Sequence, residues 1–250
     1  MKVVLITGGS RGIGQAIVRE FAAAGYQVAF TYAQNREAAD RLTTELAEQK
    51  QRAVGYQADV RDFARAQEVV KEAQEALGPI DVLINNAGIE AGAKTYMMID
   101  EDDWDSVIDT NLKSAWLMSK LFTERLVANG RKGGNIINVS SITDTRTIKG
   151  QFPYAVSKGG LTRMTEILAL EAPRYGVRVN ALAPGYILTD VSRLLLESDA
   201  APEFMKGIPM RRFGEFDDLD GPLLLLASDA SSYMNGSIVV VDGGHICASL

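Results

Sequence analysis

A tyrosine and a lysine at helical spacing form the first pair of residues able to do chemistry. The segment FPYAVSKGG, residues 152–160, places Tyr154 four positions before Lys158 in a chain with one histidine. The apolar spacing of residues 154–171 predicts a helix, which Pro153 suits as a start, so both side chains lie on one face. A phenol has a pKa of about 10, and we expect the neighbouring ammonium to lower it. The pair can then transfer a proton as histidine does elsewhere, although this spacing also occurs often by chance.

A glycine-rich turn follows the first predicted strand. TGGSRGIG, residues 7–14, carries Gly8, Gly12 and Gly14 at the start of a helix expected from near Ile13. Glycines let the backbone turn sharply and approach a pyrophosphate, and the N–H groups of a helix start attract negative charge. The spacing differs from the G-x-G-x-x-G fingerprint, and some such turns are only structural. Its place after the first strand favours a dinucleotide site.

The end of the second predicted strand bears on the choice of dinucleotide. NAD binders usually carry an acid about 20 residues past the glycines, whereas NADP binders carry a nearby arginine. FTYAQNRE has no acid before Glu37, and Arg11 and Arg36 flank the position. We therefore expect NADP, with NADPH preferred over NADH, although exposed arginines are often only solvated. The contacts expected on this side are Ser10, Arg11, Tyr32, Gln34, Asn35 and Arg36.

Composition argues against several other classes of protein. The net charge of -6 disfavours a general attraction to nucleic acid or anionic membranes. Cys247 and His245 are the only residues of their types, so one chain cannot form a disulfide or a His/Cys metal cluster. No apolar run is long enough for a membrane span or a signal peptide. We expect a cytoplasmic protein with no metal, no nucleic-acid partner and no membrane partner.

Short β-branched runs alternate with amphipathic segments along the whole chain. Several runs are almost continuously apolar, as strands covered on both faces should be. The alternation predicts an α/β protein, a single Rossmann-type domain over residues 1–250 with a doubly wound parallel sheet and helices on both faces. The seven expected strands are residues 2–7, 27–32, 53–59, 80–86, 134–141, 177–184 and 237–244.

The segment from Leu188 to Phe213 interrupts this alternation. It follows a predicted strand end, which is where open α/β sheets bind their ligands. We expect residues 188–213 to form a substrate lid, with a packed helical connection as the alternative.

Taken together, the motifs resemble those of the short-chain dehydrogenase/reductase family over the whole chain. TGGSRGIG matches the TGxxxGxG motif, and NNAG at 85–88 matches the motif of the fourth strand. Ser141 precedes Tyr154 by 13 residues, the serine-to-tyrosine spacing of the family, and YAVSK matches YxxxK. Further matches are Asn111 in DTNL, PG at 184–185, Thr189 and VDGG at 241–244.

The resemblance implies an oxidoreductase that moves a hydride between NADPH and a ketone or secondary alcohol. Tyr154 would act as general acid and base on the carbonyl oxygen, which Ser141 would hydrogen-bond. Lys158 would lower the tyrosine pKa and hold the nicotinamide ribose, and Asn111 would position a proton-relay water. Ser140 is then a structural neighbour of Ser141.

The resemblance also implies further cofactor contacts and an assembly. Asp59 and Val60 would contact the adenine, and Ile187 and Thr189 the carboxamide. Helices at 111–127 and 154–171 would pair across a two-fold axis in a homotetramer, with Trp116 and Phe122 either at that interface or in the core. The remaining implied contacts are Gly8, Gly12, Ile13, Gly14, Asn86, Ala87, Gly88, Pro184 and Gly185.

The substrate is less constrained than the reaction. The chain looks most similar to 3-oxoacyl-acyl-carrier-protein reductases and to bacterial carbonyl and polyol dehydrogenases. Acyl-carrier protein is an acidic partner that needs basic docking residues, for which Arg131, Lys132 and Arg174 are candidates. Between Ser141 and Tyr154, Arg146, Lys149 and Gln151 suggest a polar or anionic substrate instead.

Two other classes of function explain the sequence less well. A dinucleotide-sensing regulator without catalysis would be expected to lose Tyr154 or Lys158, and both are present. A methyltransferase would share a glycine-rich loop but has no use for the combination of Ser141, Tyr154 and Lys158.

Overall fold

A sheet of seven parallel strands forms the centre of the computed structural model, which describes residues 1–189 and 201–248. The strand order is β3-β2-β1-β4-β5-β6-β7, so the predicted fold class is confirmed. Most strands are shorter than predicted, because polar residues such as Asn86 leave the strand ladder to bind side chains. The strands are β1 (Val3–Ile6), β2 (Gln27–Tyr32), β3 (Ala53–Gln57), β4 (Val82–Asn85), β5 (Gly134–Val139), β6 (Val177–Pro184) and β7 (Ile238–Val241).

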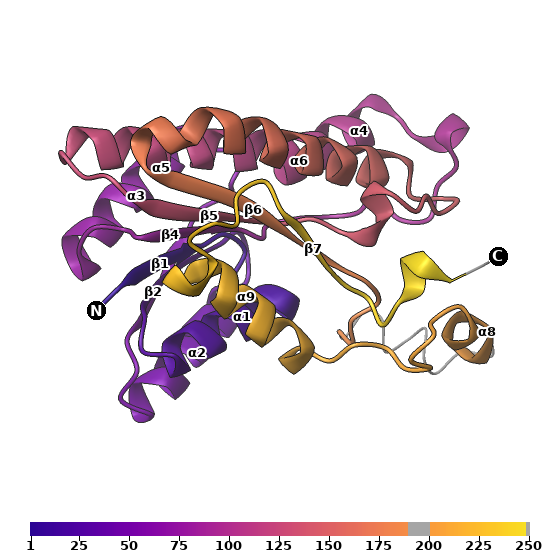
Figure 1. Cartoon of the computed structure of the whole chain (residues 1–250), viewed down its shortest axis with the longest axis horizontal. Helices are drawn as coiled ribbons and strands as arrows, with labels where there is room; N and C mark the ends of the chain where they lie inside the picture. The colour runs from indigo at the N-terminus through magenta and orange to yellow at the C-terminus, as the bar shows by residue number, and fades with distance from the viewer. Residues whose placement is uncertain (190–200, 249–250) are drawn as a thin grey trace.

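Helices cover both faces of the sheet (Figure 1). On one face α1 (Gly12–Ala23), α2 (Arg36–Glu48) and α9 (Asp217–Ala227) enclose a core cluster that includes Phe21 and Leu223. The second cluster lies between the other face and three helices, α3 (Phe63–Leu77), α5 (Ser114–Ala128) and α6 (Phe152–Glu171). A fourth helix, α4 (Glu101–Ile108), packs against α6.

The strand order reverses beside β1, which pairs with β2 on one side and β4 on the other. In open α/β sheets a crevice forms at the carboxyl ends of the strands on either side of such a reversal. The glycine-rich turn after β1 and the NNAG segment after β4 therefore meet at the same edge.

The helix predicted at 111–127 has a different beginning. Residues Asp109–Lys113 form a π-helical turn that joins α4 to α5, and Asn111 lies within it. Such turns bulge the backbone and often occur at functional sites. Within α5, Phe122 is buried in the core and Trp116 is 48% exposed, so only Trp116 remains available to an interface.

Helix α6 begins two residues earlier than predicted, at Phe152. Its spacing places Phe152, Val156, Ile167 and Leu170 on one side, and all four are exposed, Leu170 by 84%. The described part of the chain thus leaves one apolar stripe of α6 uncovered.

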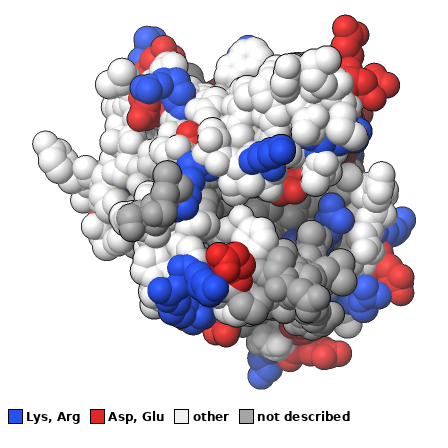
Figure 2. Space-filling view, turned by 90° about the vertical axis from the view of Figure 1, so that its right-hand side faces the viewer, with Lys and Arg blue, Asp and Glu red and all other residues white. Residues whose placement is uncertain are grey.

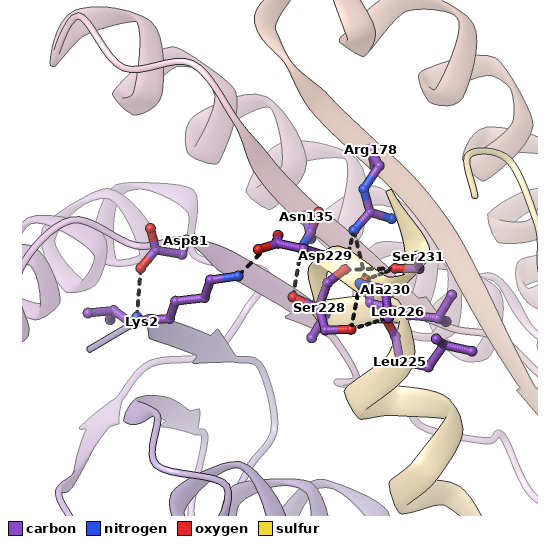
Figure 3. A network of polar contacts seen from close by, with 12 residues as sticks. Lys2, Asp81, Asn135, Arg178, Leu225, Leu226, Ser228, Asp229, Ala230 and Ser231 are labelled. Carbon is purple, nitrogen blue, oxygen red and sulfur yellow. Dashed lines mark hydrogen bonds and ion pairs between the residues drawn. The ribbon is translucent and has the colours of Figure 1, made fainter. Parts of the chain in front are cut away.

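The amino edge of the sheet is closed by a polar network (Figure 3). Arg178 on β6 donates to the carbonyl oxygens of Leu226 and Ser228 at 3.2 and 3.0 Å. Asn135 on β5 donates to the carbonyl of Ala227 at 2.8 Å, and Lys2 pairs with Asp229 at 3.3 Å. These bonds fix the end of α9 against the start of the strands.

Of the predicted lid, residues 190–200 lie outside the described residues. On either side of them, Leu188 donates its N–H to the carbonyl of Gly214 at 2.7 Å, and Ala201–Lys206 form helix α8. The lid therefore stays a prediction. No helix in the ranges 1–189 and 201–248 is both long and apolar enough to cross a membrane.

Candidate active site

The glycine-rich turn forms a tight cradle at the start of α1. A Cβ added to Gly14 would lie 2.1 Å from the carbonyl oxygen of Gly8, so no side chain fits there. Gly12 has a φ of +54° and faces open space, which suits a close approach by a ligand. No side chain caps the start of α1, whereas Asn35 caps α2 and Asp62 caps α3. The first N–H groups of α1 are therefore left to a ligand or water.

Thr7, which the sequence reading did not single out, joins this cradle to the NNAG segment. Its hydroxyl oxygen accepts hydrogen bonds from the N–H groups of Asn86 and Ala87, both at 3.0 Å. The Asn86 side chain donates in turn to the carbonyls of Thr7 and Gly8 at 3.0 and 3.1 Å. Thr7 is the first residue of the TGxxxGxG motif, so the sequence did indicate that it belongs to the site.

The predicted contacts near the second strand divide into exposed and buried residues. Arg11 and Gln34 are exposed, and Arg36 is exposed and pairs with Asp40 at 3.7 Å. Ser10 and Tyr32 are buried, and the ring of Tyr32 packs in the core. Asn35 uses its side-chain oxygen to accept from the N–H of Ala38 at 2.9 Å.

The other predicted contacts lie at strand ends. Asp59, which follows β3 and precedes Val60, pairs with Arg61 at 2.6 Å. Pro184 ends β6, and the N–H of Gly185 donates to the carbonyl of Val241 at 2.9 Å. Ile187 is buried and forms a bridge with Gly214, and Thr189 is half-buried.

Tyr154, Ser141 and Lys158 converge at the carboxyl edge of β5. The Ser141 hydroxyl lies close enough to Tyr154 to lower the pKa of its phenol, and the Lys158 ammonium lies 5.6 Å from the centre of the tyrosine ring. Lys158 is buried and donates to the carbonyl of Val139 at 2.7 Å. Ser140, which follows β5, instead hydrogen-bonds to two groups of α6. These are the carbonyl of Lys158 and the hydroxyl of Thr162.

The expected lowering of the tyrosine pKa is not found in the free protein. Burial raises the pKa of Tyr154 to about 12, against a smaller opposing effect of the Ser141 hydrogen bond. Burial also lowers the pKa of Lys158 to about 8, which the carboxylate of Glu90 partly opposes. Removal of each group from water disfavours its charged form, so the phenol holds its proton at neutral pH.

The Asn111 side chain fixes the segment that follows β4. Its amide group donates to the carbonyl of Ile89 and the hydroxyl of Ser157, both at 3.0 Å. Its oxygen accepts from the N–H of Ile89 at 2.8 Å. A Cβ on Gly88 would lie 3.5 Å from the Asn111 oxygen and 3.6 Å from the Lys158 nitrogen, so these groups are close neighbours.

A cluster of aromatic and charged side chains borders the same site. Of these, only Arg146 was identified from the sequence as a candidate site residue. The Tyr186 ring stacks on Phe213 and on His245, each with ring centres 5.5 Å apart. Arg146 donates to the carbonyl oxygen of His245, and Glu90 lies within electrostatic range of Tyr186. His245 joins this cluster through a contact with a loop 99 residues earlier in the chain, which no sequence motif indicates.

The cradle fits a dinucleotide cofactor. A side-chain-free turn at Gly8 and Gly14, uncapped N–H groups on α1 and two exposed arginines together supply what a pyrophosphate and a ribose phosphate require. Within residues 1–189 and 201–248, no group of three or more His, Cys, Asp or Glu side chains is placed to hold a metal ion.

Comparison with known proteins agrees with this geometry. The family model described as Enoyl-(Acyl carrier protein) reductase matches residues 8–245. The 3-oxoacyl-acyl-carrier-protein reductase FabG of Staphylococcus epidermidis is 36% identical over 243 residues, which cover 97% of this chain and 98% of that protein. The chain belongs to the short-chain dehydrogenase/reductase family.

Solved structures of family members superpose closely on the chain. A gluconate 5-dehydrogenase from Burkholderia cenocepacia J2315 in complex with NADP and tartrate has a TM-score of 0.91 at 32% identity, covering 99% of this chain and 96% of that one. A blue fluorescent protein from a metagenomic library in complex with NADPH has a TM-score of 0.89 at 34% identity, covering 98% and 97%. The chain is thus a family oxidoreductase acting on CH–OH or keto groups.

Proposed function

We propose that the protein reduces a ketone to a secondary alcohol with NADPH, with Tyr154 as the general acid. The observation that carries the proposal is the convergence of Tyr154, Ser141 and Lys158 beside the Gly8 to Gly14 cradle. When bound, NADPH supplies the hydride. Every other task falls to side chains of the chain itself.

Each side chain of this group has a distinct task. Ser141 donates a hydrogen bond to the carbonyl oxygen, which becomes more negative during reduction. Tyr154, protonated at neutral pH, transfers its proton to that oxygen. Lys158, still largely charged below a pKa of about 8, stabilises the tyrosinate left behind.

The preference for NADPH over NADH rests on Arg11 and Arg36. Both arginines are exposed, Arg11 just before α1 and Arg36 at the start of α2, and the end of β2 carries no acid to bind a ribose 2′-hydroxyl. Two solved relatives hold NADP or NADPH.

We favour a small carbonyl compound over an acyl-carrier-protein substrate. Arg131 pairs with Asp81 at 2.6 Å, and Arg174 stacks over Tyr175. Both arginines precede strands and so lie at the amino edge, opposite Tyr154. On the face toward which the strands point, basic and acidic side chains are interspersed (Figure 2). An acidic partner would favour a basic patch there.

We also propose a homotetramer, in which the exposed stripe of α6 and Trp116 of α5 pair with a second copy. An apolar stripe of this kind is stabilised when another surface removes it from water.

Replacement of Tyr154 by phenylalanine tests the acid role. We expect Tyr154→Phe to reduce kcat for ketone reduction by about 10²–10⁴-fold, because the site loses its proton donor. NADPH consumption with a ketone panel measures turnover, and quenching of protein fluorescence by NADPH shows that the cofactor still binds. Tyr233→Phe, at a fully exposed tyrosine, is the matched control. Undiminished turnover in Tyr154→Phe would exclude the acid role.

A further inference from the structure

Two charged side chains of opposite sign lie within electrostatic range of Tyr186, at the border of the active site, and neither donates nor accepts the transferred proton. They are Glu90, after β4, and Arg146, in the segment between Ser141 and Tyr154. Neither forms a salt bridge with any residue in the ranges 1–189 and 201–248. A charged group beside a reaction centre that forms no salt bridge is available to a ligand.

The backbone around Glu90 is fixed on both sides. The preceding residue, Ile89, exchanges two hydrogen bonds with Asn111, at 2.8 and 3.0 Å. Four residues beyond Glu90, the N–H of Lys94 donates to the carbonyl of Gly150 at 3.2 Å. The Glu90 side chain is exposed, and its carboxylate acts electrostatically on Lys158, Tyr154 and Tyr186. It is therefore held next to the reacting groups and accessible to a substrate.

Arg146 is held from the other side of the site. Its N–H donates to the carbonyl of Ile142 at 2.8 Å, and one guanidinium nitrogen donates to the carbonyl of His245. That bond engages one arm of the guanidinium, which has five N–H donors in all. The remaining guanidinium N–H groups are able to bind an anion. Two of them can donate in parallel to the two oxygens of a carboxylate.

Tyr186 lies within electrostatic range of both charges. Its ring is fixed by Phe204, Phe213 and His245, with ring centres 5.5 to 5.7 Å away. Glu90 and Arg146 both act on this one phenol, in opposite directions. Glu90 also acts on Tyr154 and Lys158, whereas the contacts of Arg146 are with Ile142 and His245, so the negative charge is the one associated with the proton-transfer group.

We propose that Glu90 and Arg146 orient the substrate, and that the substrate is a small hydroxylated keto acid. Glu90 accepts hydrogen bonds from hydroxyl groups next to the keto carbon, and Arg146 pairs with the carboxylate at the far end. A ketone without these groups leaves both charges unpaired, which polar sites reject strongly. The inference rests on the proposed function: the keto carbon accepts a hydride, its oxygen takes the Tyr154 proton, and the carboxylate and hydroxyls are unchanged.

Three probes separate the roles of the two charges. They are 5-ketogluconate, with hydroxyls and a carboxylate; fructose, with hydroxyls alone; and levulinate, with a carboxylate alone. For Arg146→Gln at pH 7, we expect the loss in kcat/KM on 5-ketogluconate to exceed the loss on fructose by about tenfold or more. For Glu90→Gln, the loss on 5-ketogluconate should exceed the loss on levulinate by about fivefold or more.

Matched controls remove exposed charges elsewhere. Glu48→Gln and Arg41→Gln lie on α2, outside the site, and should preserve the substrate ratios of the wild type. Equal losses on all three ketones in the Arg146 or Glu90 variants would overturn the proposal, as would a wild type that prefers an unsubstituted β-keto thioester.

A binding measurement distinguishes failure of this inference from failure of the proposed function. Gluconate, which cannot be reduced, should raise the melting temperature of the NADPH-loaded wild type and should not raise that of Arg146→Gln. If the wild type reduces no ketone yet gluconate still stabilises it through Arg146, the proposed function fails and the charge pair stands. If the wild type reduces ketones and gluconate has no effect, the charge pair fails alone.

Discussion

At the scale of single residues, the proton-transfer group combines a phenol with an unusually high pKa and a lysine with an unusually low one. Burial causes both shifts, because it disfavours the charged form of each group. A tyrosine that keeps its proton at neutral pH suits reduction, in which the proton must be given away. Oxidation of an alcohol would require a deprotonated Tyr154 and so favours high pH.

The pH profile of ketone reduction should follow Lys158. Lysine is charged below its pKa, so we expect kcat/KM to be high at pH 7 and to fall as pH rises through about 8. Glu90 raises the pKa of Lys158, so Glu90→Gln should move the fall to lower pH. Initial rates between pH 6 and 10 measure both effects. A profile flat to pH 10, or a shift to higher pH in the variant, would contradict this account.

The catalytic residues were predictable from sequence because they lie within short motifs. Tyr154 and Lys158 are one helical turn apart, and Ser141 is 13 residues away. Glu90 and His245 were not predictable, because their neighbours in space are remote in sequence. The direction of the tyrosine pKa shift also depended on burial, which no motif encodes.

At the scale of the helices, α1 and α9 meet through a pair of carboxyl groups. Burial, together with nearby Glu20 and Asp217, raises the pKa of Asp220 to about 6. A group whose folded-state pKa lies above its unfolded value costs stability when it is ionised. That cost is present above pH 6 and shrinks as pH falls from about 6 toward 4, where the folded state takes up the proton.

We expect Asp220→Asn to stabilise the protein at pH 8. Loss of the buried charge should contribute about 1 kcal/mol after solvent screening, equivalent to about 2–4 °C in Tm for a chain of this size. The gain should vanish near pH 4. Thermal unfolding followed by circular dichroism at both pH values measures it, with Asp105→Asn on exposed α4 as control. An equal gain at pH 4 would mean that a cause other than ionisation is responsible.

The elements themselves were largely predictable, and their ends were not. All seven strands were expected from apolar runs, and α6 from its helical spacing. The π-helical turn at Asp109–Lys113 was not expected, because its sequence continues a regular helical pattern. Its position depends on Asn111 binding Ile89 and Ser157, which are contacts between segments.

At the scale of the whole molecule, the exposed stripe of α6 leaves apolar surface in contact with water in the monomer. Phe152, Val156, Ile167 and Leu170 follow one face of the helix, and all four are exposed. The family resemblance implied that α5 and α6 pair with a second copy, but the sequence could not decide whether Trp116 or Phe122 of α5 lies at that interface.

Leu170→Glu should weaken the proposed assembly. A charge in the middle of a buried apolar contact is costly unless paired, so we expect smaller particles than the wild type at the same concentration. Sedimentation velocity measures the change, and an unaltered circular dichroism spectrum shows that the fold is retained. Met97→Glu, at another exposed apolar residue outside α6, is the control. A wild type that sediments as a monomer would contradict the tetramer.

The bond between Thr7 and Asn86 has a consequence for the order in which the protein is made. Every glycine of the phosphate loop emerges from the ribosome early. Asn86, which hydrogen-bonds the loop at Thr7, is synthesised 79 residues later. Cofactor recognition is therefore a property of long-range pairing, and a nascent chain halted before β4 would contain the motif without the site.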